Sequence, residues 1–251
     1  GQARLRAASV LVVGAGGLGS PAALYLAAAG VGRLGLADGD RVDLSNLQRQ
    51  ILHATDDLGR PKVESARERL LRLNPLVRVE AHGERVAEAN AARLVGGYDV
   101  VISAVDNPEA RYVLNDTCVR LGRPLVEAGV VGFTGFLMTV LPGRGPCFRC
   151  VFPEPPADPP TCAEAGVLGA LAGVLGSLQA LEALKLLLGR GEVYAGRLLT
   201  VDGLSGRFRE IPWPRDPSCP ACGGALALRG AVGSGAGVAG RRAGGGGGAA
   251  S

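Results

Sequence analysis

The chain has 251 residues, of which 47% are hydrophobic and 20% charged, and its formal net charge is +4. This length is enough to bury a full core, as one large domain or two small ones, and the composition is that of a globular protein. The charge is mild and no long basic block is present, which argues against nucleic acid as a partner. The first nine residues lack the apolar segment of a secretory signal, so we expect a cytoplasmic protein.

The stretch from residue 9 to residue 38 has the pattern of a nucleotide-binding unit. An apolar run at 10–13 predicts a buried strand, residues 20–29 predict a helix, and residues 33–37 predict a second strand. The first strand and the helix are joined by four glycines, Gly14, Gly16, Gly17 and Gly19. Such glycines allow a tight turn and bring a phosphate close to the free N–H groups of the helix. Asp38, at the end of the second predicted strand, is expected to accept a hydrogen bond from a ribose hydroxyl of the nucleotide.

This glycine pattern indicates that a nucleotide binds but does not distinguish NAD from ATP. The alternative is a glycine-rich turn that binds no ligand.

Strands and helices alternate in the next part of the chain. Pro61 begins a predicted helix that Asn74-Pro75 ends, and the other expected helices are 87–94 and 109–121. The expected strands are 77–81, 99–104 and 124–127. This alternation predicts a parallel sheet with helices on both faces, whose ligands bind at the carboxyl ends of the strands. Asp38, Asp106 and Asn107 are expected at that end.

The character of the sequence changes near residue 133. Strands are expected at 136–141 and 198–202, and the apolar stretch 166–188 predicts a helix. This helix is read as buried rather than membrane-spanning because it carries Gln179, Glu182 and Lys185. Gly169 and Gly173 favour close approach of another helix, either within the monomer or across a dimer. The Gly- and Ala-rich residues 225–251 predict a disordered tail.

The cysteines carry a second strong signal. Four of the six form two Cys-x-x-Cys pairs, Cys147 with Cys150 and Cys219 with Cys222. Two such pairs supply the four thiolates of a tetrahedral zinc site without an open position, which would be structural. A redox pair or disulfides are the alternatives.

The remaining cysteines and the two histidines show no catalytic pattern of their own. Cys118 is expected to be a small buried hydrophobic residue. Cys162 precedes the long helix, where a thiol can be reactive, and we weigh a role in acyl or sulfur transfer against an incidental surface thiol. His53 and His82 are expected to be surface or loop residues.

Taken together, these motifs resemble those of the MoeB/ThiF adenylyltransferases, relatives of ubiquitin-activating enzymes. The resemblance covers residues 1 to about 224. It rests on the glycine loop, the acidic pair Asp38 and Asp40, the segment from Ser45 to Gln50, Lys62, Asp106-Asn107 and the two cysteine pairs. It implies a Rossmann-like α/β fold whose mostly parallel sheet is extended by antiparallel strands. The nucleotide-binding part would be 1–132, and the carrier-binding and zinc part 133–224.

The resemblance also implies an activity, ATP-dependent adenylation of the C-terminal Gly-Gly of a small ubiquitin-like sulfur carrier. Arg49 and Lys62 would grip the triphosphate, Asp106 would hold Mg²⁺, and Cys162 matches the family's mobile-loop cysteine. The other nucleotide-binding residues would be Gly14, Gly16, Gly17, Asp38, Asp40, Ser45, Asn46, Leu47, Gln48 and Asn107. The carboxylate that attacks is already ionised at neutral pH, so no general base is required.

The implied partners are a MoaD- or ThiS-like carrier, a sulfur donor (cysteine desulfurase or rhodanese) and a second copy of the chain. The pathways would be those of molybdopterin, thiamin or tRNA thiolation, and no nucleic acid or membrane is expected. Two other functions compete with this one. They are a non-catalytic scaffold of the same fold that binds a ubiquitin-like partner, and an NAD-dependent oxidoreductase.

Overall fold

The computed structural model describes residues 1–155 and 166–224, and its centre is one eight-stranded sheet. The strand order is β3-β2-β1-β4-β5-β6-β7-β8, with β1 to β5 parallel and β6 to β8 antiparallel to their neighbours. The strands are β1 (Ser9–Val13), β2 (Arg33–Ala37), β3 (Arg78–His82), β4 (Val100–Ser103), β5 (Leu125–Val131), β6 (Thr134–Val140), β7 (Arg197–Asp202) and β8 (Arg207–Pro212).

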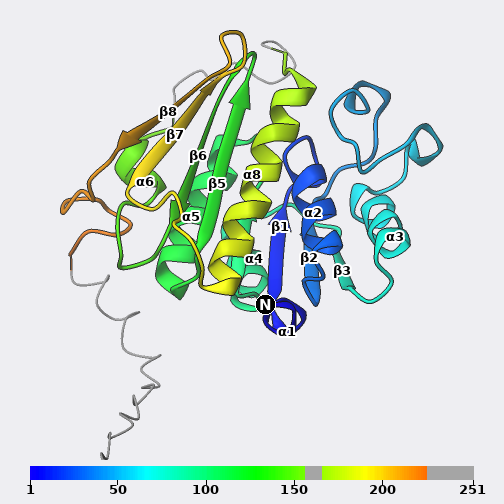
Figure 1. Ribbon diagram of the computed structural model, residues 1–251, viewed down its shortest axis with the longest axis horizontal. Coiled ribbons are helices and arrows are strands. Elements are labelled where there is room, and N and C mark those ends of the chain that lie inside the picture. The colour runs from blue at the N-terminus through cyan, green and yellow to red at the C-terminus, as the bar shows by residue number, and fades with distance from the viewer. Residues whose placement is uncertain (156–165, 225–251) are drawn as a thin grey trace, which may run out of the picture.

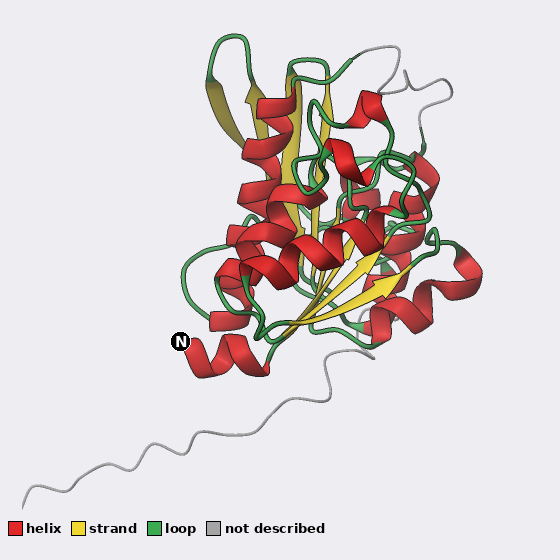
Figure 2. Ribbon diagram, turned by 90° about the vertical axis from the view of Figure 1, so that its right-hand side faces the viewer, coloured by secondary structure: helices red, strands yellow, loops and turns green. Residues whose placement is uncertain are grey.

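Helices cover both faces of this sheet (Figures 1 and 2). The long helix α8 packs on β4, β5 and β6 and lies on the near side of the sheet in Figure 1, while α4 and α5 lie on the opposite face. The α-helices are α1 (Gln2–Ala7), α2 (Gly19–Ala28), α3 (Lys62–Leu73), α4 (Glu88–Gly96), α5 (Pro108–Leu121), α6 (Phe148–Val151) and α8 (Gly169–Leu188). Two short 3₁₀ helices, Leu44–Asn46 and Thr55–Asp57, lie between β2 and α3.

The core has two layers, one on each face of the sheet, because successive side chains of a strand point to opposite faces. In β1, Val10 and Val12 pack with α2, α3 and α8, whereas Leu11 and Val13 pack with α4 and α5. Successive strand residues point to opposite faces, and both faces here are covered. A strand buried on both sides is therefore apolar throughout, as β1 is.

The predicted strands and helices of the first half are all present, with ends that differ by one to a few residues. Helix α1, helix α6 and strand β8 were not predicted. Strand β8 was not predicted because all six of its residues are exposed and its sequence, RFREIP, has no apolar run. The change of character near residue 133 corresponds to the change from parallel to antiparallel pairing at β6.

Helix α8 is the one described helix that is long and apolar enough to cross a membrane by length and composition. Within the fold it packs on α2 and on the sheet. The close helix contact occurs at Gly176, where an added Cβ would lie 2.2 Å from the Leu18 carbonyl oxygen. At Gly173 an added Cβ would meet no atom of the described residues within 4 Å, and Gly169 approaches the Gln48 loop instead. A close approach of two helices within the monomer therefore occurs, but at Gly176 and not at the predicted Gly169 and Gly173.

Candidate active site

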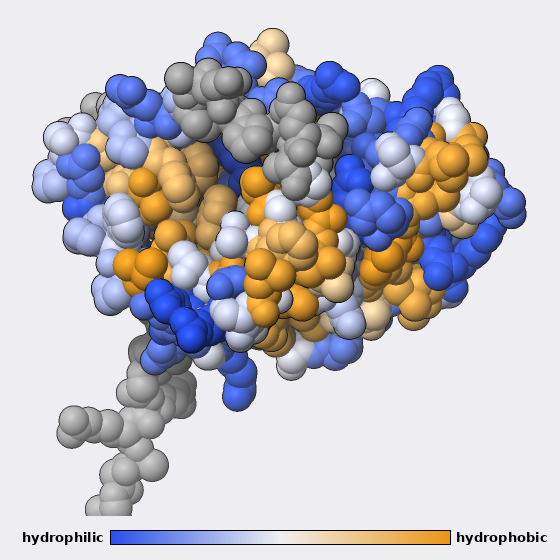
Figure 3. All heavy atoms as spheres, turned by 90° about the horizontal axis from the view of Figure 1, so that it is seen from above, coloured by the Kyte–Doolittle hydropathy of each residue, from blue (hydrophilic) through white to orange (hydrophobic). Residues whose placement is uncertain are grey.

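A cavity of about 900 Å³ opens at the carboxyl ends of the parallel strands. It begins at the glycine loop after β1, passes the ends of β2 and β4, and continues onto β5, β6, β7 and β8. Figure 3 looks down on this end of the molecule, where apolar patches alternate with hydrophilic side chains. The predicted residues that line the cavity are Gly14, Gly16, Gly17, Asp38, Asp40, Arg49, Lys62, Asp106 and Asn107.

The glycine loop is shaped by contacts that exclude larger residues. Gly14 has φ +97°, and an added Cβ would lie 2.5 Å from the Ala104 carbonyl oxygen. Helix α2 begins at Gly19, where an added Cβ would lie 1.8 Å from the Gly14 carbonyl oxygen. These two glycines are needed for the turn itself, whereas Gly16 and Gly17 leave room at the cavity wall. The Ser20 N–H already donates to the Gly16 carbonyl at 2.9 Å and Pro21 carries no N–H, so an anion there would be favoured mainly by the positive end of the α2 dipole.

Asp38 organises the backbone on both sides of the cavity. Its Oδ2 accepts a hydrogen bond from the Ala15 N–H at 2.8 Å, and its Oδ1 accepts one from the Asp40 N–H at 2.8 Å. The carboxylate thereby joins the end of β2 to the glycine loop. Each oxygen keeps a second lone pair for a ligand hydroxyl.

Asp40 lies between two cations at the cavity edge. It contacts Lys62 Nζ at 3.2 Å and Arg85 Nη2 at 2.6 Å. Burial alone would raise the pKa of Asp40, but Arg85 and Lys62 lower it below its usual value. Lys62 is itself buried and begins α3, so its ammonium group is held in place. Arg85 was missed because no motif marks the loop from which it comes.

Arg49 reaches the cavity from a turn built by its own segment. Asp43 caps the first 3₁₀ helix by accepting from the Ser45 N–H at 2.8 Å, and Arg49 Nη1 donates to the Ser45 carbonyl at 3.1 Å. Gln50 also lines the cavity, and its buried Oε1 has no hydrogen-bond donor among the described residues. The predicted residues of this segment that do not line the cavity are Ser45, Asn46, Leu47 and Gln48.

Asp106 and Asn107 follow β4 and face the same cavity. Asn107 Oδ1 caps α5 by accepting from the N–H of Glu109 at 2.8 Å. The Asp106 carboxylate is exposed and accepts no hydrogen bond from any residue in the described ranges. A carboxylate in this state remains available for a cation.

His53 lies in a loop, as one of the two expectations had it, but it is buried and not at the surface. Its Nε2 lies 3.0 Å from the Ala15 carbonyl oxygen and its Nδ1 lies 2.8 Å from Ser65 Oγ. Burial lowers the pKa of His53, which favours the neutral ring. The imidazole therefore connects the glycine loop to α3 and stabilises the cavity wall. His82 is half-buried at the end of β3 and pairs with the Tyr98 hydroxyl at 2.9 Å.

Arg111 forms the floor of the cavity beneath β5 and β6. Its guanidinium donates to Glu127, to the Ala128 carbonyl at 2.7 Å and to the Val105 carbonyl at 2.7 Å. Burial raises the pKa of Glu127 to about 7 although Arg111 opposes the shift. Neither residue was predicted to belong to the site, because their ion pair joins α5 to β5 and no local sequence pattern indicates such a contact.

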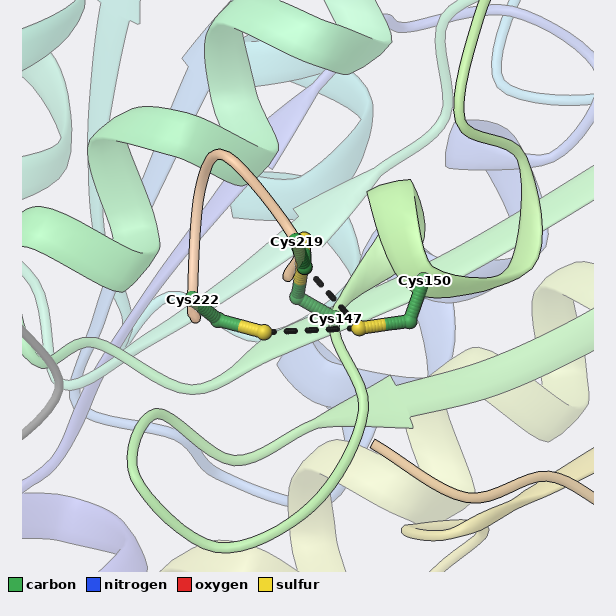
Figure 4. Close-up of side chains that lie close together, drawn as sticks. All are labelled: Cys147, Cys150, Cys219 and Cys222. Atoms are coloured by element: carbon green, nitrogen blue, oxygen red, sulfur yellow. Dashed lines mark hydrogen bonds between the residues drawn. The ribbon is translucent and has the colours of Figure 1, made fainter. Parts of the chain in front are cut away.

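The four paired cysteines meet in one buried cluster (Figure 4). Cys147 and Cys150 flank the start of α6, and Cys219 and Cys222 come from the segment after β8. The sulfur atoms lie 4.0 Å apart within the first pair, 3.6 Å between Cys147 and Cys219, and 3.4 Å between Cys150 and Cys222. These separations exclude disulfide bonds between them, which require about 2.05 Å.

This cluster fits a tetrahedral metal ion. A zinc ion with Zn–S bonds of about 2.3 Å requires sulfur–sulfur distances of about 3.8 Å, close to those present. Burial raises the pKa of the Cys150 thiol to about 11, and a bound cation would reverse this shift. Asn115 Nδ2 adds a contact of 3.7 Å to Cys147 Sγ. The donor set therefore suits a closed structural site.

The two cysteines outside the cluster are Cys118 and Cys162. Cys118 is fully buried in α5, as predicted. Cys162 lies outside the described residues.

Chemically, the cavity brings the start of α2 together with cations near the glycine loop and with the Asp106 carboxylate. Lys62, Arg49 and Arg85 can neutralise a polyphosphate, while Asp106 can hold a hard cation beside it. The cavity continues over an apolar surface around Phe136.

Comparisons with known proteins point to one family. The model of the ThiF family matches residues 1–221. The sulfur carrier protein adenylyltransferase of Thermus thermophilus is 52% identical over 89% of this chain and 85% of its own length. The SAMP-activating enzyme E1 of Haloferax volcanii is 50% identical over 89% of this chain and 83% of its own. The mouse adenylyltransferase and sulfurtransferase MOCS3 is 53% identical, and the chain spans about half of it (49%).

Solved structures support the same fold. Escherichia coli MccB, bound to MccA-N7isoASN, matches with a TM-score of 0.81 and 23% identity over 89% of this chain and 69% of that one. At this identity the similarity concerns the fold alone.

Proposed function

Because this chain belongs to the ThiF family and is an adenylyltransferase, as are its relatives at about 50% identity, we propose that it activates a ubiquitin-like sulfur carrier. The carrier's C-terminal Gly-Gly carboxylate would attack ATP, forming an acyl-adenylate and releasing pyrophosphate. One observation carries this proposal. A single cavity joins the glycine loop, Lys62, Arg49 and Asp106 to an apolar groove over the antiparallel strands.

The residues of the cavity have separate tasks in this reaction. Asp38 would accept the ribose hydroxyls, and the start of α2 would face the phosphates. Arg49 and Lys62 would neutralise the charge that develops on the leaving pyrophosphate. The carrier carboxylate is ionised at neutral pH, so positioning and charge stabilisation suffice, and no catalytic histidine is needed. His53, which is held by Ala15 and Ser65, serves structure only.

Two metal ions complete the proposal. Mg²⁺ prefers carboxylate, phosphate and water oxygens, and the free Asp106 carboxylate at the cavity edge suits it. Zn²⁺ would be held by Cys147, Cys150, Cys219 and Cys222, and it would fix the segment after β8 to α6.

The carrier tail would need glycines at its end because only a chain without side chains can bring a carboxylate so close to a buried phosphate. The adenylate would then be open to a sulfur nucleophile from a donor protein, and Cys162 is proposed to take part in that transfer. Molybdopterin, thiamin and tRNA thiolation are the candidate pathways. We also propose a homodimer in the cytoplasm.

ATP–pyrophosphate exchange tests the proposal, using Mg²⁺ and a panel of Gly-Gly-terminated carriers. Exchange with one carrier would name its pathway, and exchange with several would indicate a shared activating enzyme. No exchange with any carrier, together with retained carrier binding, would favour a non-catalytic scaffold. A preference for NAD over ATP would favour an oxidoreductase, although that function leaves Arg49 and Lys62 without a task.

A further inference from the structure

The antiparallel half of the sheet presents an open face that is continuous with the cavity. On β6, Thr134 and Phe136 share this face with Thr200 and Asp202 of β7, because they are direct cross-strand partners. On β8 their partners are Arg209, opposite Thr200, and Arg207, opposite Asp202. All six side chains line the cavity. The register therefore places two arginines at the outer end of the groove.

The guanidinium groups of these two arginines form no ion pair that would stabilise the described part of the fold. Neither Arg207 nor Arg209 is in an ion pair with any residue of the described ranges, and both are exposed. The neighbouring Asp202 is occupied by its own turn, since it accepts from Ser205 Oγ at 2.6 Å and from the Leu204 N–H at 3.0 Å. By contrast, Arg197 of β7 is paired with Glu210 at 2.8 Å. The groove therefore carries two arginines without an ion-pair partner among the described residues, with the Asp202 carboxylate opposite Arg207 and the Glu154 carboxylate also in the lining.

The groove is built for an extended chain that passes this point. Gly129 of β5 leaves space for the Phe136 ring, since an added Cβ would lie 2.4 Å from Phe136 Cε1. The ring forms an apolar floor between the Arg111 guanidinium and β7. Four strand spacings of about 4.8 Å separate β4, which precedes Asp106, from β8, giving about 19 Å. An extended chain covers that distance in about six residues.

We propose that Arg207 and Arg209 are specificity residues that bind an acidic side chain of the carrier about five to seven residues before its terminal glycine. This inference rests on the proposed function and adds to it a requirement on the tail sequence. Carriers with an acid at that point are favoured, and carriers with a basic residue there are rejected by repulsion.

The test compares the carrier dependence of ATP–pyrophosphate exchange in enzyme variants, using a carrier that supports exchange with the wild type. In Arg207→Glu/Arg209→Glu the KM for the carrier is expected to rise at least about tenfold, while the KM for ATP is unchanged. Arg207→Lys/Arg209→Lys keeps the charge and is expected to retain most of the carrier affinity. The control Arg69→Glu/Arg144→Glu makes the same charge change at two exposed residues outside the cavity and is expected to behave as wild type.

A charge exchange gives the second arm of the test. A carrier whose tail acid is replaced by Lys is expected to react poorly with the wild type and to recover with Arg207→Glu/Arg209→Glu. An unchanged carrier KM in the reversal variant would overturn the inference while leaving the proposed function intact. The inference would also be overturned if a carrier without an acidic residue about five to seven positions before its terminal glycine reacted as well as a carrier with one. A wild type that shows no exchange with any carrier would instead contradict the proposed function.

Discussion

At the scale of single residues, Asp106 bears the clearest chemical prediction. Its carboxylate is exposed in the cavity beside the glycine loop, and no described residue donates to it. Replacing Asp106 with Ala is expected to lower carrier-dependent exchange at least about 100-fold, because the proposed Mg²⁺ loses its protein ligand. The control Glu109→Ala removes an exposed acid three residues away, outside this cavity. Retained exchange in Asp106→Ala with an unchanged melting temperature would contradict the role given to Asp106.

Glu127 gives a prediction about pH. Burial raises its folded pKa to about 7 from an ordinary value of 4.5. The folded state therefore binds a proton that the unfolded state has already lost between these values, and stability falls as pH rises through this window. The effect is at most about 3 kcal/mol. Urea unfolding at pH 5 and pH 8 is expected to show this fall in the wild type and a smaller one in Glu127→Gln. Equal pH dependence in the two proteins would refute it.

Among the elements, α2 and α8 meet at a contact that only glycine permits. An alanine at position 176 would place its Cβ 2.2 Å from the Leu18 carbonyl oxygen and 2.6 Å from the Pro21 ring. Gly176→Ala is expected to lower the free energy of unfolding by about 1–3 kcal/mol through overpacking. Gly173→Ala, one turn earlier in open space, is expected to raise it by about 0.5–1 kcal/mol. Chemical denaturation measures both, and similar effects at both positions would show that this contact is misplaced.

The cysteine cluster is the second element-level test. Cys219→Ser removes one of four thiolates that lie within 4.8 Å of one another. Zinc content is expected to fall well below one per chain, and the melting temperature is expected to fall with it. Cys118→Ala, at a buried cysteine outside the cluster, is expected to keep the metal. Elemental analysis of the purified variants decides, and full zinc in Cys219→Ser would rule out the four-thiolate site.

The sequence predicted the parts of the fold and the site that depend on local patterns. The glycine loop, Asp38 and Asp106 were placed correctly because each adjoins an apolar strand whose carboxyl end faces one edge of the sheet. The cysteine cluster was found although 72 residues separate Cys147 from Cys219, because thiol pairs have a characteristic spacing.

What could not be predicted depends on pairing between distant segments. Strand β8 is exposed along its whole length, so it carries no alternation of apolar and polar residues. Its arginines enter the site only through the register with β7. Arg85 and Arg111 likewise reach the cavity through contacts with Asp40 and Glu127 that no motif encodes. The burial of His53 was not predicted because it follows from the docking of α3 against the glycine loop.

For the whole molecule, one continuous sheet carries both parts of the proposed site. Its parallel half carries the glycine loop, which is the proposed nucleotide-binding element, and its antiparallel half carries the groove proposed for the carrier. The cysteine cluster lies beneath the same antiparallel strands and brings the C-terminal described segment together with α6. Under the proposed function, nucleotide and carrier would approach the same point from two directions.

The measurement that tests this account most directly is mass spectrometry of the carrier after brief reaction with the enzyme, ATP and Mg²⁺. We expect the carrier to gain the mass of one adenylate at its C-terminus, and a carrier without its last two glycines to gain none. Addition of pyrophosphate should reverse the gain. A carrier that binds the enzyme in the presence of ATP and is recovered unmodified, without release of pyrophosphate, would contradict the proposed activation.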